Sequence, residues 1–216
     1  MSTTARSNRG SGFKLDRLAG FSDGVIAIAI TLLVLGLEVP SSHKVNTSEL
    51  GNYLRESLHP AMGYVVSFVL IGTFWLSHFV IFHYLTHATR PLIVLNGLFL
   101  LCLTFLPFPT GLQAAYRHDE FAMVFYSFSL FMCGITLLGI WLYASRQHRL
   151  IDPNTSPTVV QSMTQRLLIA PSLCILAIGC SFLSIGLSKI ILIAIPCFYF
   201  SHQLADSGWR ASEPSS

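Results

Sequence analysis

The sequence predicts an all-α polytopic membrane protein with six transmembrane helices per chain, and two observations lead to this fold class. Only 11% of the 216 residues are charged, against about 25% in a typical soluble domain, while apolar residues make up 52%. Long stretches also contain no Asp, Glu, Lys or Arg: residues 24–37, 57–89, 91–116, 121–145, 167–188 and 190–205. Four of them reach the ~20 residues that cross a bilayer, and two approach this length. They lack the alternating polarity of transmembrane β-strands.

The predicted helices cover residues 20–38, 61–84, 91–113, 121–145, 167–187 and 189–203. The first helix is expected to end before Pro40, because proline cannot continue a helix. Pro60 and Pro91 lie at or beside the first turns of the next two helices, where a missing amide hydrogen is tolerated. The last two helices are expected to be separated by Gly186, Ser188 and Lys189. Further prolines are expected to bend or end their helices: Pro107, Pro109, Pro171 and Pro196.

The Lys and Arg residues outside the apolar runs predict the orientation. Nine lie in the N-terminal arm, the even-numbered connections and the tail: Arg6, Arg9, Lys14, Arg17, Arg90, Arg146, Arg149, Arg166 and Arg210. Four lie in the other connections: Lys44, Arg55, Arg117 and Lys189. This asymmetry places both termini in the cytoplasm and the protein in the cell membrane. The chain then divides into a cytoplasmic arm (1–16), a six-helix transmembrane domain (17–203) and a cytoplasmic tail (204–216).

Several other roles find little support in the sequence. A cleaved signal peptide is disfavoured, because no small-residue cleavage site follows the first apolar run and Asp23 interrupts its start. The net charge of +3 comes from the predicted cytoplasmic arginines, so it indicates contact with the lipid bilayer and gives no case for nucleic acid. The five cysteines all fall within predicted spans, as packing residues. No nucleophile elbow, zinc-protease motif or phosphate-binding loop is present, so no enzyme activity is expected.

The first predicted helix carries two distinct stripes. At ~100° per residue, Gly24, Ile28, Thr31 and Leu35 fall along one stripe, flanked by Leu32. A neighbouring stripe, about a quarter-turn away, contains Asp23, Ala27, Ile30 and Val34. Asp23 and Thr31 are therefore expected to face different surroundings, although the wheel alone is equally compatible with ordinary apolar packing.

A polar cluster is expected near the cytoplasmic ends of the first three helices. His78 lies in the cytoplasmic half of the second helix, and Asn96 lies in the second turn of the third. An Asp23–His78–Asn96 cluster, with Arg17 nearby at the membrane surface, would keep an ionised carboxylate out of lipid. Such a cluster acts either as a proton or ion relay or as a network that ties three helices together, and the second role is favoured.

His83 and His87 form the only other pair with a suggestive spacing. At i and i+4 they point to the same side of a helix and can share a metal ion. No third ligand accompanies them, and their position at the inner membrane boundary is typical of solvated interfacial side chains. No metal site is therefore expected there, nor is a carbonyl filter of the T-V-G-Y-G type present.

The segment Arg17-Leu-Ala-Gly-Phe21-Ser22-Asp23-Gly24-Val25, continuing to Leu33, resembles the R-x-x-x-F-S-D signature of the transmembrane protein 175 family. This family comprises endosomal and lysosomal potassium channels with single-repeat prokaryotic relatives. Six spans in about 200 residues are similar to one family repeat, so the resemblance covers nearly the whole chain. The pair Trp75 and His78 in the second span looks similar to a further family feature.

The resemblance implies a homotetrameric potassium channel whose central pore is lined by the first helix. Carried onto this sequence, the pore-lining residues would be Ile28 as the narrowest apolar ring, Thr31 as a threonine ring near the permeating potassium, and Leu32 and Leu35 as further apolar layers. Signature residues would hold the helix in place, away from the ions: Arg17, Phe21, Ser22, Asp23, Trp75, His78 and Asn96. Isoleucine at position 28, where some relatives carry leucine, affects the expected ring size. No cofactor other than permeating potassium is implied.

Two alternatives stay open. A proton-coupled secondary transporter would use Asp23 and His78, and it predicts saturable, pH-coupled uptake. A non-conducting membrane scaffold would use the polar cluster only to pack helices.

Overall fold

The computed structural model describes residues 14–37 and 49–205, and this part of the chain is helical, which confirms the predicted fold class. Two short 3₁₀ segments and an isolated β-bridge accompany the α-helices. The elements are α1 (Leu15–Leu32), η1 (Leu33–Gly36), α2 (Leu50–Tyr84), α3 (Arg90–Phe105), α4 (Pro107–Ala115), α5 (Glu120–Ser145), η2 (Arg146–His148), α6 (Pro157–Ser181) and α7 (Ile185–Ala205). The predicted arm (1–16) and tail (204–216) lie mostly outside the described residues.

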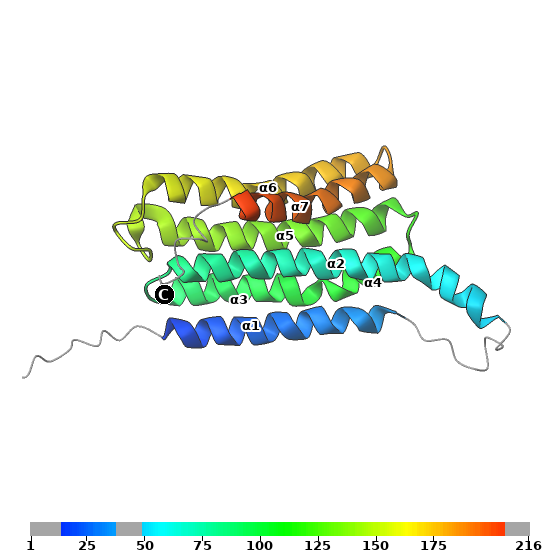
Figure 1. Ribbon diagram of the computed structural model, residues 1–216, viewed down its shortest axis with the longest axis horizontal. Helices are drawn as coiled ribbons and strands as arrows, with labels where there is room; N and C mark the ends of the chain where they lie inside the picture. The colour runs from blue at the N-terminus through cyan, green and yellow to red at the C-terminus, as the bar shows by residue number, and fades with distance from the viewer. Residues whose placement is uncertain (1–13, 38–48, 206–216) are drawn as a thin grey trace, which may run out of the picture.

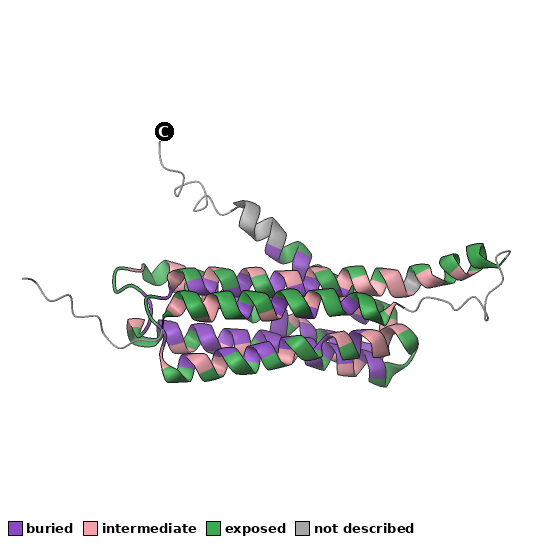
Figure 2. Cartoon of the chain, turned by 90° about the horizontal axis from the view of Figure 1, so that it is seen from below, coloured by how far each residue is buried: buried purple, intermediate pink, exposed green. Residues whose placement is uncertain are grey.

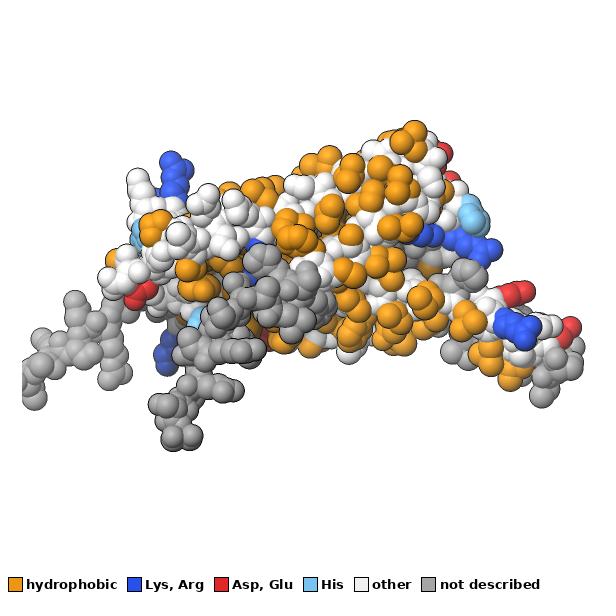
Figure 3. Space-filling view, turned by 45° about the horizontal axis from the view of Figure 1, so that its top comes forward, with side chains coloured by type: hydrophobic (Ala, Val, Ile, Leu, Met, Phe, Trp, Pro, Cys, Tyr) orange, Lys and Arg blue, Asp and Glu red, His pale blue; other side chains and the backbone are white. Residues whose placement is uncertain are grey.

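The helices run side by side along one axis, with α1 at one edge of the bundle and α6 and α7 at the other (Figure 1). Five helical segments in the described part are long and apolar enough to cross a membrane, and the described part of α7 adds a shorter apolar helix, Ile185–Tyr199. Apolar side chains cover the middle of the face in Figure 3, and most of its charged side chains lie at the two ends. This distribution is that of a bundle spanning a bilayer.

The second helix begins earlier than predicted. It starts at Leu50 instead of residue 61, so Pro60 lies inside the helix and not at its first turn. At 1.5 Å per residue, 35 residues extend about 52 Å, well beyond a ~30 Å hydrocarbon core. The first turns of α2 accordingly project past the end of the bundle (Figure 1). The expectation was wrong because an apolar run marks only the part of a helix that lies in lipid, and α2 extends beyond its apolar run.

The predicted third helix is divided into α3 and α4. The break falls at Leu106, whose amide bonds to the Leu103 carbonyl at 3.1 Å in a tightened last turn. Pro107 follows as the first residue of α4, where its missing amide hydrogen leaves no helical bond unmade. Pro109, Pro171 and Pro196, by contrast, lie within α4, α6 and α7 without ending them.

The boundaries of the last two helices also differ from the prediction. Helix α6 starts at Pro157, ten residues before the predicted start, because Ser156 caps it by accepting a hydrogen bond from the Thr158 amide at 3.3 Å. Arg166 therefore lies inside a membrane helix and not in a connection. The separation from α7 falls at residues 182–184, and Gly186, Ser188 and Lys189 belong to the first turns of α7.

Helix α5 forms the centre of the bundle, with 56% of its most apolar stretch buried. The Trp141 side chain is fully buried, and its Nε1 donates to Thr164 Oγ1 of α6 at 3.0 Å. Gly134 lets α5 and α6 approach closely, because a Cβ atom there would lie 3.1 Å from Cδ of Pro171. Small residues at a crossing are how membrane helices gain van der Waals contact without a hydrophobic driving force.

Backbone hydrogen bonds tie the loops together at the end of the bundle where α2 and α5 finish. The Thr86 amide donates to the Leu150 carbonyl at 2.8 Å, and Leu85 pairs with Ile151 in the isolated bridge. Buried residues run through the interior of the bundle, while exposed ones follow the outward faces of the helices (Figure 2).

Candidate functional site

Helix α1 has one buried face and one broad uncovered face. Ser22, Ile26, Ala29 and Leu33 recur every three or four residues and are buried. Helix α1 packs mainly against α3 and α2. Only 22% of the most apolar stretch of α1 is buried, far less than in the central helix α5.

The uncovered face carries the residues expected to line a pore. Ile28 is 60% exposed and Leu35 is 74% exposed, and Thr31 and Leu32 are exposed as well. Leu35 lies in η1, because the α-helix ends at Leu32 and the chain continues with 3₁₀ geometry. The Thr31 hydroxyl donates to the Ile28 carbonyl at 2.8 Å. Since that bond uses its single proton, both lone pairs of Thr31 Oγ1 stay available to a cation.

A chain of three hydrogen bonds, two of them buried, fixes the opposite face of α1. His78 Nε2 lies 2.8 Å from Asn96 Oδ1, Asn96 Nδ2 donates to Ser22 Oγ at 2.8 Å, and Ser22 Oγ donates to the Leu18 carbonyl at 2.9 Å. Because Asn96 Oδ1 can only accept, His78 Nε2 must carry a proton. Each hydrogen bond in the chain is then donated in the direction of α1. The first bond joins α2 to α3, the second joins α3 to α1, and the third lies within α1.

Aromatic rings enclose His78 within the bundle. Its imidazole stacks on Phe82 at 4.1 Å and on Phe99 at 5.4 Å between ring centroids, and the side chain is 1% exposed. Among the described residues, no group pairs with its Nδ1 atom. The geometry therefore locks the ring orientation and leaves His78 one fixed partner, Asn96.

Asp23 does not join His78 and Asn96 in one hydrogen-bonded cluster, as the sequence had suggested. Its Oδ1 accepts from Trp75 Nε1 at 2.9 Å on the exposed side of α1 and α2. The neighbouring Ser22 supplies the link to Asn96 instead. Asp23 was the expected partner because an ionised acid in lipid requires one. Successive positions of a helix point about 100° apart, so Ser22 faces the buried network and Asp23 does not.

The other signature residues lie on the outer surface of the protomer. Phe21 is 63% exposed, and Arg17 is exposed in the first turn of α1, which begins at Leu15. Arg17 thus belongs to the helix and does not precede it. Within the described chain, neither side chain is buried against a neighbouring helix, so any role in holding α1 needs surroundings outside the protomer.

A second buried network was not anticipated from the sequence. Ser67 Oγ lies 2.8 Å from the Tyr126 hydroxyl, and Thr110 Oγ1 donates to Ser67 Oγ at 3.1 Å. It links α2, α4 and α5 at the end of the bundle opposite His78. The sequence does contain a sign of this network. Ser67, Thr110 and Tyr126 are hydroxyl residues inside uncharged spans, and a hydroxyl group within a membrane needs a hydrogen-bond partner in the protein.

The histidine pair offers no metal centre. Over residues 14–37 and 49–205, no group of three or more His, Cys, Asp or Glu side chains is placed to hold a metal ion. His87 Nδ1 lies 3.0 Å from the Thr86 hydroxyl, whereas His83 packs edge-on against Tyr84.

Comparison with known proteins gives consistent matches. The family described as "Endosomal/lysosomal potassium channel TMEM175" matches residues 17–107. A potassium channel of Chamaesiphon minutus is 34% identical over 175 residues, covering 80% of this chain and 86% of that protein. A crystal structure of a lysosomal potassium-selective channel TMEM175 homolog from the same organism has a TM-score of 0.78 at 30% identity, covering 87% of this chain and 97% of that one.

A vertebrate relative carries a different description. The endosomal/lysosomal proton channel TMEM175 of Bos taurus is 32% identical over 142 residues, which cover 61% of this chain and 30% of the bovine protein. The match therefore covers less than a third of the length of the bovine protein.

We predict that Asn96→Ala destabilises the protein by about 2 kcal/mol, because it strands a buried imidazole N–H and removes the link to α1. Thermal unfolding of the detergent-solubilised protein, followed by size-exclusion chromatography, measures the effect. Asn52→Ala, at an exposed position of α2, is the matched control and should leave the midpoint unchanged. Equal midpoints for the two variants would show that the hydrogen-bond chain does not hold α1.

Proposed function

The chain belongs to the TMEM175 potassium channel family. We propose that it conducts potassium ions across a membrane through a central pore formed by four copies of α1. One observation carries the pore assignment: α1 is a membrane-length apolar helix whose Ile28–Thr31–Leu35 stripe is left uncovered by the described residues of the chain. Fourfold assembly around this stripe would bring four copies of each side chain to one axis. The pore contains no cofactor other than the permeating ion.

Apolar rings control water in this pore. Ile28 side chains from four subunits form its narrowest ring, with Leu32 and Leu35 as further apolar layers. A tight ring of this kind excludes water and thereby stops ions, which must keep or replace their hydration shell. Widening of the ring admits water and opens the pathway. The closed state needs no charged gate.

The Thr31 ring is the proposed site of ion selection. Hard cations such as potassium prefer oxygen ligands, and a threonine hydroxyl that already donates its proton presents only lone pairs. The 2.8 Å bond from Thr31 to the Ile28 carbonyl orients the hydroxyl in this way. Four such oxygens can partly replace the water lost by an ion passing the apolar rings.

The buried chain of Ser22, Asn96 and His78 positions the pore helix and stays out of the ion path. The support is geometric. Ser22 lies on the face of α1 opposite Ile28, and it is bonded to Asn96, which in turn is bonded to His78. Asp23 and Trp75 form a second, exposed link between α1 and α2. A proton-coupled transporter using Asp23 and His78 is less well supported, since their hydrogen bonds lead to different partners. A non-conducting scaffold is disfavoured by the family membership.

Proton permeation through the same pore is a second candidate activity. The observation that favours it is the description of the bovine relative as a proton channel. Protons need only a continuous file of water, so an opened apolar ring would pass them as well as potassium.

The proposed location is the cell membrane, with both termini in the cytoplasm and the α1–α2 connection outside. The support is the excess of Lys and Arg on the predicted cytoplasmic side, which is eight against four once Arg166 is set aside as a residue within α6. We expect a reporter enzyme fused into the α1–α2 connection to show an extracytoplasmic location and one fused at the C-terminus to show a cytoplasmic one. The opposite pattern would invert the orientation.

We predict that Ile28→Asn increases potassium flux roughly tenfold, because a polar ring wets more readily than an apolar one. Flux of the purified protein in liposomes measures this. The matched control is Ile175→Asn, since Ile175 is 59% exposed on α6, at the opposite edge of the bundle. It should leave flux unchanged. Flux that rises equally in both variants, or in neither, would rule out Ile28 as the gate.

We predict that Thr31→Ala lowers the potassium-to-sodium permeability ratio about fivefold, equivalent to about 1 kcal/mol, whereas Thr31→Ser keeps it. Reversal potentials of single channels in bilayers under potassium, sodium and pH gradients measure the ratios and separate potassium from proton conduction. A ratio unaffected by loss of the hydroxyl would assign selection to another layer.

A further inference from the structure

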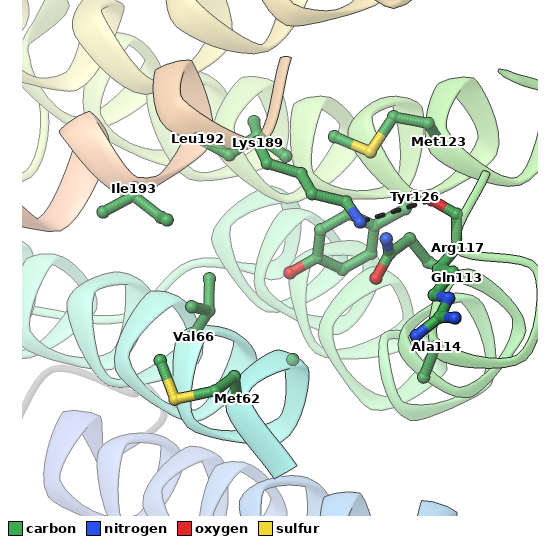
Figure 4. A pocket seen from close by; sticks show the side chains of 11 residues that line it. Met62, Val66, Gln113, Ala114, Arg117, Met123, Tyr126, Lys189, Leu192 and Ile193 are labelled. Carbon is green, nitrogen blue, oxygen red and sulfur yellow. Dashed lines mark hydrogen bonds between the residues drawn. The ribbon is translucent and has the colours of Figure 1, made fainter. Parts of the chain in front are cut away.

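A cavity of about 240 Å³ lies between α2, α4, α5 and α7, away from the α1 face. Its apolar wall comes mainly from Met62, Val66, Met123, Leu192 and Ile193 (Figure 4). Met123 and Leu192 are almost fully buried, so this part of the wall belongs to the protein core. The volume is below that of a typical drug-sized pocket, but it accommodates a segment of an acyl chain.

Polar groups stand at one side of this cavity. Lys189 Nζ donates to the Arg117 carbonyl at 3.3 Å, and the Gln113 amide lies nearby (Figure 4). An ammonium group has three donors, and this bond occupies one of them. Of the residues that line the cavity, all within the described chain, none is Asp or Glu. The lining therefore offers two cations and no competing carboxylate.

Both cations lie at one end of the bundle. Lys189 is in the second turn of α7, and Arg117 lies two residues beyond Ala115, the last residue of α4. A helix end of this kind is where lipid head groups are expected. A lysine in an apolar helix is unfavourable unless it reaches an anion or the interface. Basic pockets between membrane helices bind anionic lipid heads on the cytoplasmic side of other proteins. In the proposed orientation the same chemistry would act here in the outer leaflet.

We propose that this cavity binds a membrane lipid, with its anionic phosphate head at Lys189 and Arg117 and part of one acyl chain against Met62, Val66 and Ile193. Tyr126, whose hydroxyl lies 2.8 Å from Ser67 Oγ, also lines the cavity. The lipid would bridge α2, α4 and α7, and so add to the direct packing of α2 against α4 and α7. This site is independent of the pore on α1.

The test compares lipid retention by the purified full-length protein in native mass spectrometry. Dioleoyl phosphatidylglycerol supplies the anionic head and dioleoyl phosphatidylcholine the zwitterionic one. We expect the wild type to retain phosphatidylglycerol about 25-fold more strongly, and each lost cation to reduce this about fivefold. Lys189→Gln with Arg117→Gln should therefore remove the preference. Arg90→Gln, an exposed cation at the other end of the bundle, should keep it.

A second variant tests the cavity without changing its charge. A Cβ atom at Gly63 would meet only Gln113 Oε1, at 4.0 Å, so the side chain of Gly63→Leu would occupy the cavity. It should weaken phosphatidylglycerol retention about fivefold, while Gly51→Leu, at an open position of the same helix, should not. Excess inorganic phosphate should not displace the lipid.

Three results would overturn the proposal. These are equal retention of the two lipids by the wild type, unchanged retention in both the Lys189→Gln/Arg117→Gln and Gly63→Leu variants, and displacement by inorganic phosphate alone. The last would indicate a site for the free anion without an acyl chain.

Discussion

The attachment of α1 to the rest of the bundle depends on the buried hydrogen bonds from His78 through Asn96 to Ser22. In a bilayer, apolar side chains gain little by leaving lipid for protein, so packing and polar bonds must hold a peripheral helix. Helix α1 has a narrow buried stripe, and the Asn96 amide of α3 donates a hydrogen bond to Ser22 within it. That amide bonds to groups of α1 and α2 at once, which determines the rotation of α1 about its axis.

The rotation decides what the uncovered face presents. With Ser22, Ile26 and Ala29 turned inward, Ile28, Thr31 and Leu35 necessarily turn outward, because successive positions of a helix differ by about 100°. A rotation by one position would place a different set of side chains on that face. In the proposed pore, the polar chain would therefore influence ion passage without any contact with the ion. The proposed gate of apolar side chains would depend on such indirect positioning, since its rings make no directional bonds.

The bundle combines a firmly packed half with a loosely attached helix. Helix α5 contacts α3, α4, α6 and α7 and contains the buried Trp141, while α1 is held along a single stripe. The cavity beside Lys189 lies within the packed half, between α2, α4, α5 and α7. The proposed lipid would act on the packed half, whereas changes of α1 would act on the proposed pore.

The sequence by itself determined the membrane class, the helical fold and the unusual character of the first helix, because charge-free length and 3.6-residue periodicity are local properties. The predicted starts of α2 and α6 were wrong, because Pro60 lies within α2 and Arg166 lies within α6 without ending either helix. Only the tertiary structure assigned Ser22 to the buried network and Asp23 to Trp75. Their side chains are adjacent in the chain, and the partner that each one meets depends on how α2 and α3 pack against α1.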